Sequence, residues 1–284
     1  MTPLTLTDVI KNIRDLPALP AVVLELMNAL EEEDSSAQVL AEKVSNDQAL
    51  TAKTLRLANS SFYGLQSKVT TIAQAIAILG FNCVRNLVTA TAVLGNFSTS
   101  KSEAFNIHGF WRHSIATALC ARSLARLLKA NQDNAFMVGL LHDIGRLVLA
   151  TRLPQYYENV LAYRGAQDCY AIEAERAVLG IDHAMVGQAL AEHWKFPVLL
   201  QQAIADHHTP ENQDKGALAS IIHVADCIVH ALDLSGDEQD MVPPVSAFAW
   251  NAMNFDQDML MRIFRETEMQ FEEESRILIE GQVK

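Results

Sequence analysis

The helical spacing of apolar residues constrains the fold of this chain more than any other feature. Apolar residues recur every three or four positions, for example at Val22, Leu26 and Leu30. This spacing places them on one face of a helix. The two-residue alternation of a half-buried strand is hard to find, and the sparse glycines fall mostly between periodic segments. The sequence therefore predicts an all-α fold.

Turn and cap residues divide the periodic segments into separate helices. Ser35 or Ser36 is expected to cap a helix that carries Val39 and Val44. The further helices are expected over 71–79, closed by Gly80, and over 81–97, 110–129, 134–149 with a break near Gly145, 156–164, 169–179, 182–194, 198–207, 216–232 and 256–278.

The chain is long enough for two helical sub-domains. A polar, serine-rich stretch over 97–102 interrupts the apolar periodicity. We therefore expect an N-terminal helical sub-domain over 1–100, a helical bundle over 101–235 and a C-terminal helical extension over 236–284.

Charge and composition limit the class of partner. The formal net charge is -12, with an isoelectric point of about 5.2. This argues against a non-specific nucleic-acid binder and against binding to an anionic membrane surface, since both need basic faces. We see neither a signal peptide nor an apolar run of the length that spans a bilayer. Four scattered cysteines without a CxxC pair fit small buried residues in a reducing compartment. A cytoplasmic protein is expected.

Two ionisable residues, His142 and Asp143, interrupt the apolar segment Gly139–Leu147. Burying either one without a partner costs several kcal/mol. A hydrogen-bonded pair in the core would satisfy both, and so would a bound metal ion, since imidazole and carboxylate are common ligands of transition metals. The pair alone leaves both interpretations open.

Further ionisable residues lie in equally apolar surroundings. Asp226 is embedded in Ile221–Val229, which is nearly as anomalous as His142-Asp143. Buried aspartates without cationic partners are rare, and the neighbouring segments offer few lysines or arginines. The other candidates are His113, His183, His207 and His208. A metal ion is the simplest partner common to all of them. His108, His193, His223 and His230 are expected to lie outside this set.

The order of these residues resembles the metal motif of the HD-domain superfamily. The pattern His … His-Asp … His … His-His … Asp reads here as His113, His142-Asp143, His183, His207-His208 and Asp226. The N-terminal segments Leu16–Pro20, Asp47–Thr51, Leu57–Gly64 and Ala75–Gly80, together with Phe110–Ser114, resemble the HDOD family (HD-related output domain), a relative of the HD-GYP group. The resemblance covers roughly residues 8 to 230.

The resemblance implies a dinuclear metal centre in a multi-helical bundle. His113, His142, Asp143 and Asp226 would hold one metal. Asp143 would bridge to a second metal held by His183, His207 and His208. The implied metals are divalent iron, manganese, nickel or zinc.

The implied activity is hydrolysis of a phosphoester, such as one in a nucleotide, with a role in bacterial signal transduction. Asp143 would be catalytic, and Arg146, one turn away, would bind phosphate or form a plain surface salt bridge.

Two departures from the relatives bear on function. The Gly-Tyr-Pro segment that follows His-His in cyclic di-GMP phosphodiesterases is replaced by Thr209-Pro210-Glu211-Asn212, which argues against that substrate. Many HDOD proteins have lost metal ligands, whereas this sequence keeps all seven positions. The alternative is a non-catalytic signalling or scaffold module that binds a protein or nucleotide partner.

Overall fold

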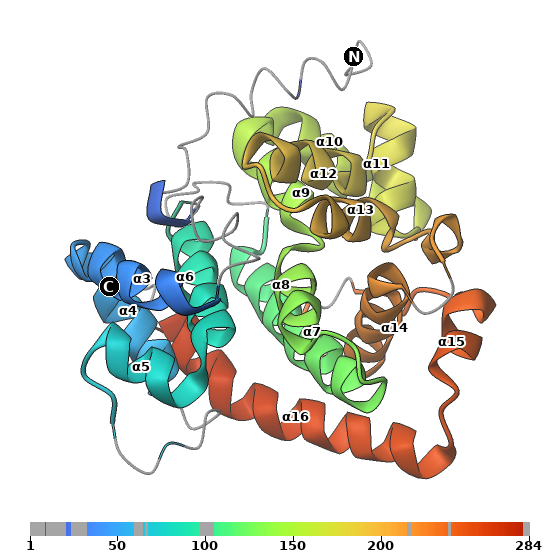
Figure 1. The fold of residues 1–284 in the computed structure, drawn as a ribbon. Coiled ribbons are helices and arrows are strands. Elements are labelled where there is room, and N and C mark those ends of the chain that lie inside the picture. Colours follow the sequence, from blue (N-terminus) through green and yellow to red (C-terminus); the bar gives the residue numbers. More distant parts are fainter. Residues whose placement is uncertain are drawn as a thin grey trace. The chain divides into compact units, whose positions relative to one another are not determined.

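The fold is all-α, as the sequence predicts (Figure 1). The computed structural model describes residues 9, 21–23, 33–59, 65, 68–96, 105–214, 217–237 and 240–280, and these contain no strand. The chain divides into two compact units. The larger unit comprises 1–16, 100–193 and 198–268, and the smaller unit comprises 17–99, 194–197 and 269–284.

Four helices with described bounds lie wholly within the smaller unit, which also includes α16 from Met269 onward: α3 (Glu33–Ser45), α4 (Gln48–Ala58), α5 (Ile72–Leu79) and α6 (Phe81–Asn96). Helix α5 begins where the Thr71 side chain accepts a hydrogen bond from the backbone N–H of Gln74. It ends at Gly80, whose φ of 86° favours glycine. Ser35 and Ser36 do not cap a helix, because α3 already begins at Glu33.

The larger unit contains α7 (Ile107–Leu127), α8 (Gln132–Leu141), α9 (Ile144–Arg152), α10 (Pro154–Gln167), α11 (Ala171–Leu179), α12 (His183–His193), α13 (Val198–Asp206), the short 3₁₀ helix η2 (Pro210–Asn212), α14 (Leu218–Ala231), α15 (Ala247–Met253) and the part of α16 (Gln257–Glu280) that precedes Met269. The helix α15 was not expected from the sequence. It begins at Ser246, whose side chain accepts a hydrogen bond from the backbone N–H of Ala249.

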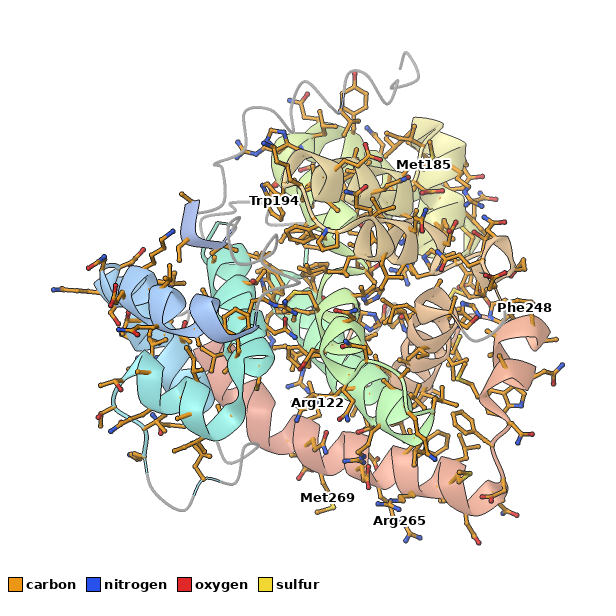
Figure 2. All side chains as sticks on the ribbon, viewed as in Figure 1. Arg122, Met185, Trp194, Phe248, Arg265 and Met269 are labelled. Atoms are coloured by element: carbon orange, nitrogen blue, oxygen red, sulfur yellow. The ribbon has the colours of Figure 1, made fainter. Side chains whose placement is uncertain are left out.

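Helices α7 and α14 form the centre of the larger unit. Both are buried around most of their circumference and pack against each other. Figure 2 draws the described side chains on the ribbon. Helices with apolar residues on all faces belong in a core. Helix α8 packs alongside α7. A Cβ atom at Gly139 would lie only 2.7 Å from the Cα atom of Ala118, so glycine permits this close approach.

The break between α8 and α9 lies at His142 and Asp143, two residues before Gly145, near which it was expected. Gly145 instead lies inside α9, where it allows close contact with α12. A Cβ atom at Gly145 would lie 2.0 Å from the backbone oxygen of His183. The two anomalous ionisable residues therefore occupy a helix junction, which a helix-to-helix contact holds in place.

Some of the expected features lie outside the described residues. These are the motif over 16–20, most of the segment over 57–64 and the boundary over 97–102. Within the described part of the chain, no helix is both long and apolar enough to cross a bilayer. Cys120, Cys169 and Cys227 are free thiols, and Cys120 and Cys227 are buried.

Candidate metal centre

The seven motif residues converge in the larger unit. His113 lies in the middle of α7 and Asp226 in the middle of α14, whereas His183 is the first residue of α12. The remaining four lie at helix ends: His142 and Asp143 between α8 and α9, and His207 and His208 directly after α13. At helix ends, side chains project from several directions into one space.

The first group consists of His113, His142 and Asp226, which are all buried. The Nε2 atom of His113 lies 3.0 Å from Oδ1 of Asp226 and 3.2 Å from Nε2 of His142. The Nε2 atom of His142 lies 3.6 Å from the same oxygen of Asp226 and 3.8 Å from Oδ1 of Asp143. Asp143 thus lies at the edge of this group.

The second group consists of Asp143, His183, His207 and His208. The Nε2 atom of His183 lies 3.1 Å from Oδ1 of Asp143 and 2.8 Å from Nε2 of His208. The Nε2 atom of His207 lies 3.8 Å from the same oxygen of Asp143. Asp143 therefore lies between the two groups, in the bridging position that the sequence resemblance implies.

These separations fit ligands around shared ions. Two atoms that each lie about 2.1 Å from one metal are about 3.0 Å apart at a right angle and about 3.4 Å apart at the tetrahedral angle. The measured separations run from 2.8 to 3.8 Å. The Nε2 atom of His207 is buried and has no hydrogen-bond partner among the described residues, which fits a nitrogen that binds an ion.

The Nδ1 atoms of three histidines are held by neighbouring acceptors. His142 Nδ1 lies 2.7 Å from the carbonyl oxygen of Gly139, and His207 Nδ1 lies 2.7 Å from that of Ile204. His183 Nδ1 lies 2.6 Å from Oε2 of Glu175. A metal-ligating histidine characteristically donates its other ring N–H in this way, which leaves the Nε2 lone pair free for the ion.

Glu175 supports the second group from α11 and was not expected from the sequence. It is fully buried, and Oε2 also accepts a hydrogen bond from the backbone N–H of His183. A glutamate is common in a helix with one solvent-facing side, so the sequence gives no sign that Glu175 is buried. The contact of Glu175 with His183 at the start of α12 reveals that it supports a ligand.

The electrostatics of the group favour charged carboxylates. Burial raises the pKa of Asp143, but His142, His183 and Arg146 outweigh it and hold that pKa well below the ordinary value. Burial opposes protonation of His183, yet the charges of Glu175 and Asp143 raise its pKa to about 10. Burial, reinforced by His142 and His183, lowers the pKa of His207 to about 3, so this imidazole stays neutral and able to bind a metal.

Arg146 lies at the edge of the second group rather than on the open surface. Its Nη1 atom donates to Oδ2 of Asp143 at 2.9 Å, and Nε donates to the hydroxyl of Tyr157 at 3.4 Å. The expected alternative of a plain surface salt bridge is therefore wrong, since both partners are largely buried. Arg146 remains charged beside the centre.

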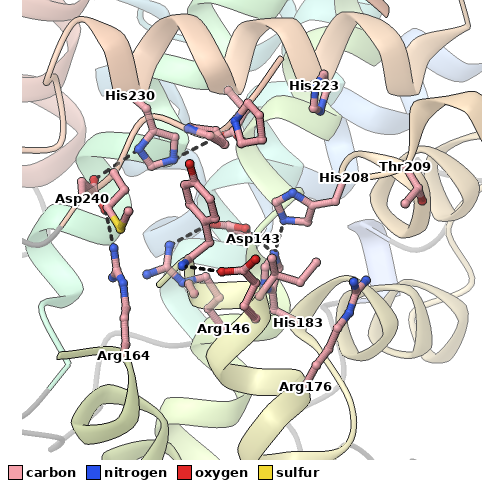
Figure 3. A pocket seen from close by; sticks show the side chains of 18 residues that line it. Asp143, Arg146, Arg164, Arg176, His183, His208, Thr209, His223, His230 and Asp240 are labelled. Atoms are coloured by element: carbon pink, nitrogen blue, oxygen red, sulfur yellow. Dashed lines mark hydrogen bonds and ion pairs between the residues drawn. The ribbon is translucent and has the colours of Figure 1, made fainter. Parts of the chain in front are cut away.

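A cavity of about 330 Å³ opens onto the second group (Figure 3). Asp143, Arg146, His183 and His208 line its inner part. Its wall also includes the charged side chains of Arg164, Glu173, Arg176 and Asp240 and the ring of Tyr170. A proline-containing loop adds Met241, Pro243 and Pro244. The volume lies near the lower end of the range for small-molecule sites.

The histidines expected to lie outside the set behave in two ways. His223 is engaged by backbone groups at both nitrogens, because Nδ1 lies 2.8 Å from the carbonyl of His207 and Nε2 accepts from the N–H of Ser246. His230 differs from that expectation. Its Nε2 atom lies 3.4 Å from Oδ1 of Asp226, one helical turn away. In the sequence, the spacing of four residues between Asp226 and His230 could have indicated this contact, because residues four apart are neighbours on a helix.

Comparison with known proteins identifies relatives along most of the chain. A curated Treponema pallidum (strain Nichols) protein named only as uncharacterized is 25% identical over 228 residues, which cover 78% of this chain and 43% of that protein. The Bacillus subtilis (strain 168) protein YuxH is 28% identical over 153 residues, 51% of this chain and 37% of YuxH. This chain thus spans less than half the length of either curated relative.

Two crystal structures have similar folds. An HDOD domain protein of unknown function from Geobacter sulfurreducens matches with a TM-score of 0.80 and 24% identity, covering 96% of this chain and 98% of that one. A Shewanella amazonensis SB2B protein named as a candidate phosphohydrolase matches with a TM-score of 0.68 and 28% identity, covering 93% and 97%. The HDOD domain family itself matches residues 16–210, and this chain belongs to that family.

Proposed function

We propose that this chain is a metal-dependent phosphohydrolase that cleaves a phosphoester, such as one in a nucleotide, at a dinuclear metal centre. The observation that carries the proposal is the position of Asp143 between two groups of inward-facing histidines. Buried histidines whose Nδ1 atoms are already engaged are arranged to bind ions, which a plain hydrogen-bonded core does not require.

The ligand set suits borderline transition metals. Imidazole nitrogens with a minority of carboxylates favour divalent iron, manganese, nickel or zinc over calcium or magnesium. When bound, two such ions supply a nucleophilic hydroxide at neutral pH and neutralise charge on the phosphoryl group. In the reaction, the oxygen of water forms a bond to phosphorus, the ester P–O bond breaks, and the leaving alcohol takes up a proton.

The residues of the chain position the substrate. Arg146 holds a positive charge at the inner end of the cavity, where a phosphoryl oxygen would enter beside Asp143. The proline-containing loop with Met241, Pro243 and Pro244 faces the cavity from the outer side and offers an apolar wall. The volume of about 330 Å³ suits a mononucleotide or a compound of similar size better than a cyclic dinucleotide.

The name of the Shewanella amazonensis protein also supports this activity. A non-catalytic signalling module is the second candidate. It is favoured by the smaller unit, since α3 to α6 carry none of the seven motif residues.

Metal content and hydrolysis together test the proposal. We expect protein purified without added metal to contain about two transition-metal ions per chain. It should hydrolyse a generic phosphomonoester or a member of a nucleotide panel. Asp143→Ala should lose bound metal and reduce hydrolysis by about 100-fold or more. The loss of a ligand shared by both metals should cost at least as much activity as the loss of a residue that only supports a ligand.

Asp168→Asn is the matched control. Asp168 is exposed and its backbone is left-handed, which asparagine tolerates. This variant should retain both metal and activity. A metal-loaded wild-type chain that hydrolyses none of these compounds would favour the signalling module instead.

A further inference from the structure

A third set of ligand-type side chains lies beside the first group and is not part of the expected motif. His113 of α7, His230 of α14 and Asp240 in the loop after α14 each present one ligand atom, and these atoms lie within 4.8 Å of one another. Two imidazoles and a carboxylate form a donor set suited to a divalent transition metal.

The separation of His230 and Asp240 leaves room for an ion. The Nδ1 atom of His230 lies 3.6 Å from Oδ2 of Asp240, which is too long for a hydrogen bond. That nitrogen is buried and has no hydrogen-bond partner in the described part of the chain. Two atoms that share a tetrahedral ion at about 2.1 Å are about 3.4 Å apart, which is close to the separation found here.

Neighbouring contacts hold both side chains in place. The hydroxyl of Ser235 donates to Oδ2 of Asp240 at 2.5 Å, and Nη2 of Arg164 lies 3.8 Å from Oδ1. His230 is held from the opposite side by Asp226. The labelled side chains in Figure 3 show His230 and Arg164 approaching Asp240 from two directions. The third set is therefore ordered before any ion arrives.

Exposure differs between the third set and the first group. The side chains of His230 and Asp240, which belong to the third set alone, are 13% and 12% exposed and line the open cavity. Those of His142 and Asp226, which belong to the first group alone, are 1% and 5% exposed, although Asp226 also lines the cavity. Of these four residues, His230 and Asp240 are therefore the more accessible to an ion in the cavity.

The shared residue His113 links the two positions. A neutral imidazole offers one lone pair, so His113 ligates one ion at a time. An ion held by His230 and Asp240 and an ion in the first group therefore compete for His113. The two positions therefore cannot both hold an ion with His113 as a ligand.

We propose that His113, His230 and Asp240 form a loading site, at which a divalent transition metal binds before it passes to the first group. This rests on metal binding by the first group, which is part of the proposed function, but it does not depend on hydrolysis.

The rate of metal uptake tests the loading site. The metal-free chain of 284 residues is mixed with Co²⁺ in a stopped-flow instrument, and the visible absorbance of the bound ion is followed. In Asp240→Asn we expect one phase of uptake to be slowed about tenfold, while the final absorbance stays close to that of the wild type.

The matched control is Glu173→Gln. Glu173 is an exposed residue that lines the same cavity, so this change removes one negative charge from the cavity without touching the loading site. If Asp240→Asn takes up Co²⁺ as fast as Glu173→Gln, the loading site is ruled out.

A second measurement traps the ion at the loading site. His142→Ala removes a ligand of the first group but none of the loading site. We expect this variant to bind as many Co²⁺ ions as the wild type, and His142→Ala/Asp240→Asn to bind one fewer. A single His142→Ala variant that has already lost one ion would contradict the proposal. Normal loading kinetics in a chain without hydrolytic activity would instead overturn the proposed function alone.

Discussion

At the scale of single residues, the candidate centre depends on how its neighbours hold each ligand. Arg146 contacts Asp143 through one nitrogen and Tyr157 through another. Glu175 contacts both the ring and the backbone N–H of His183. Such supporting residues fix the direction and the charge of a ligand, so changes in them should alter binding without removing a ligand.

Arg146→Gln should weaken substrate binding. The loss of a fixed positive charge beside the cavity should raise the KM for a phosphomonoester about tenfold, which corresponds to about 1.4 kcal/mol. Steady-state kinetics at saturating metal would measure it. Arg152→Gln is the control, because Arg152 lies on the same helix and is exposed. An unchanged KM in Arg146→Gln would exclude a role in binding phosphate.

Glu175→Gln should change how the stability of the metal-free chain depends on pH. The pKa of His183 is raised to about 10 in the folded chain, from an ordinary value of 6.5. The folded state therefore keeps a proton that the unfolded state loses, and this contribution to the free energy of unfolding declines as pH rises from about 6.5 to 10. Without the charge of Glu175 the pKa of His183 falls, so the decline should be shallower.

Urea unfolding at several pH values between 6.5 and 9 would measure this slope. The control is Glu173→Gln, since Glu173 lies on the same helix but is exposed. It should follow the wild-type slope. Equal slopes for Glu175→Gln and the wild type would show that Glu175 does not set the protonation of His183.

His142, Asp143 and Asp226 could be predicted because each is a polar anomaly in an apolar segment, whereas the four other histidines of the motif were expected from the residue order that resembles the family. Supporting residues give no such signal. Glu175 reaches His183 only because α11 leads into α12, and Asp240 lies in a loop whose path the sequence does not fix. Helix ends could be predicted only to within a few residues, since the break expected near Gly145 lies at His142-Asp143.

At the scale of elements, the contact between α9 and α12 sets the spacing of the second group. Asp143 precedes α9 and His183 begins α12, so the distance between these helices controls the distance between the two side chains. Gly145 is the point of closest approach.

Gly145→Ala should therefore destabilise the fold and disturb metal binding. The added methyl group would meet the backbone of His183 and Gly187, which are not flexible side-chain ends. We expect a loss of about 3 kcal/mol in the free energy of unfolding and weaker binding of the second-group ion. Chemical denaturation and metal titration would measure the two effects.

The control for this change is Gly165→Ala in α10. No heavy atom lies within 4 Å of the new Cβ position, so the substitution should stabilise the chain by about 0.5–1 kcal/mol. Equal stability of the two variants would show that the helices can separate at Gly145 without cost.

At the scale of the whole molecule, all seven motif residues belong to the larger unit. They come from α7, from the junction of α8 and α9, and from α12, α13 and α14. An ion that binds to them links segments that are distant in sequence. Ion binding should therefore stabilise the larger unit as a whole.

Hydrogen exchange with and without metal should detect this selective stabilisation. A ligand present at 100 times its Kd stabilises the state that binds it by about 2.7 kcal/mol. We expect this increase in protection in α7, α8, α12 and α14, and little change in α3 to α6, which contain no ligand. Asp143→Ala should abolish most of the difference. Protection that rises equally in both units would instead mean that they unfold together, because metal bound to the larger unit would then stabilise the helices of the smaller unit to the same extent.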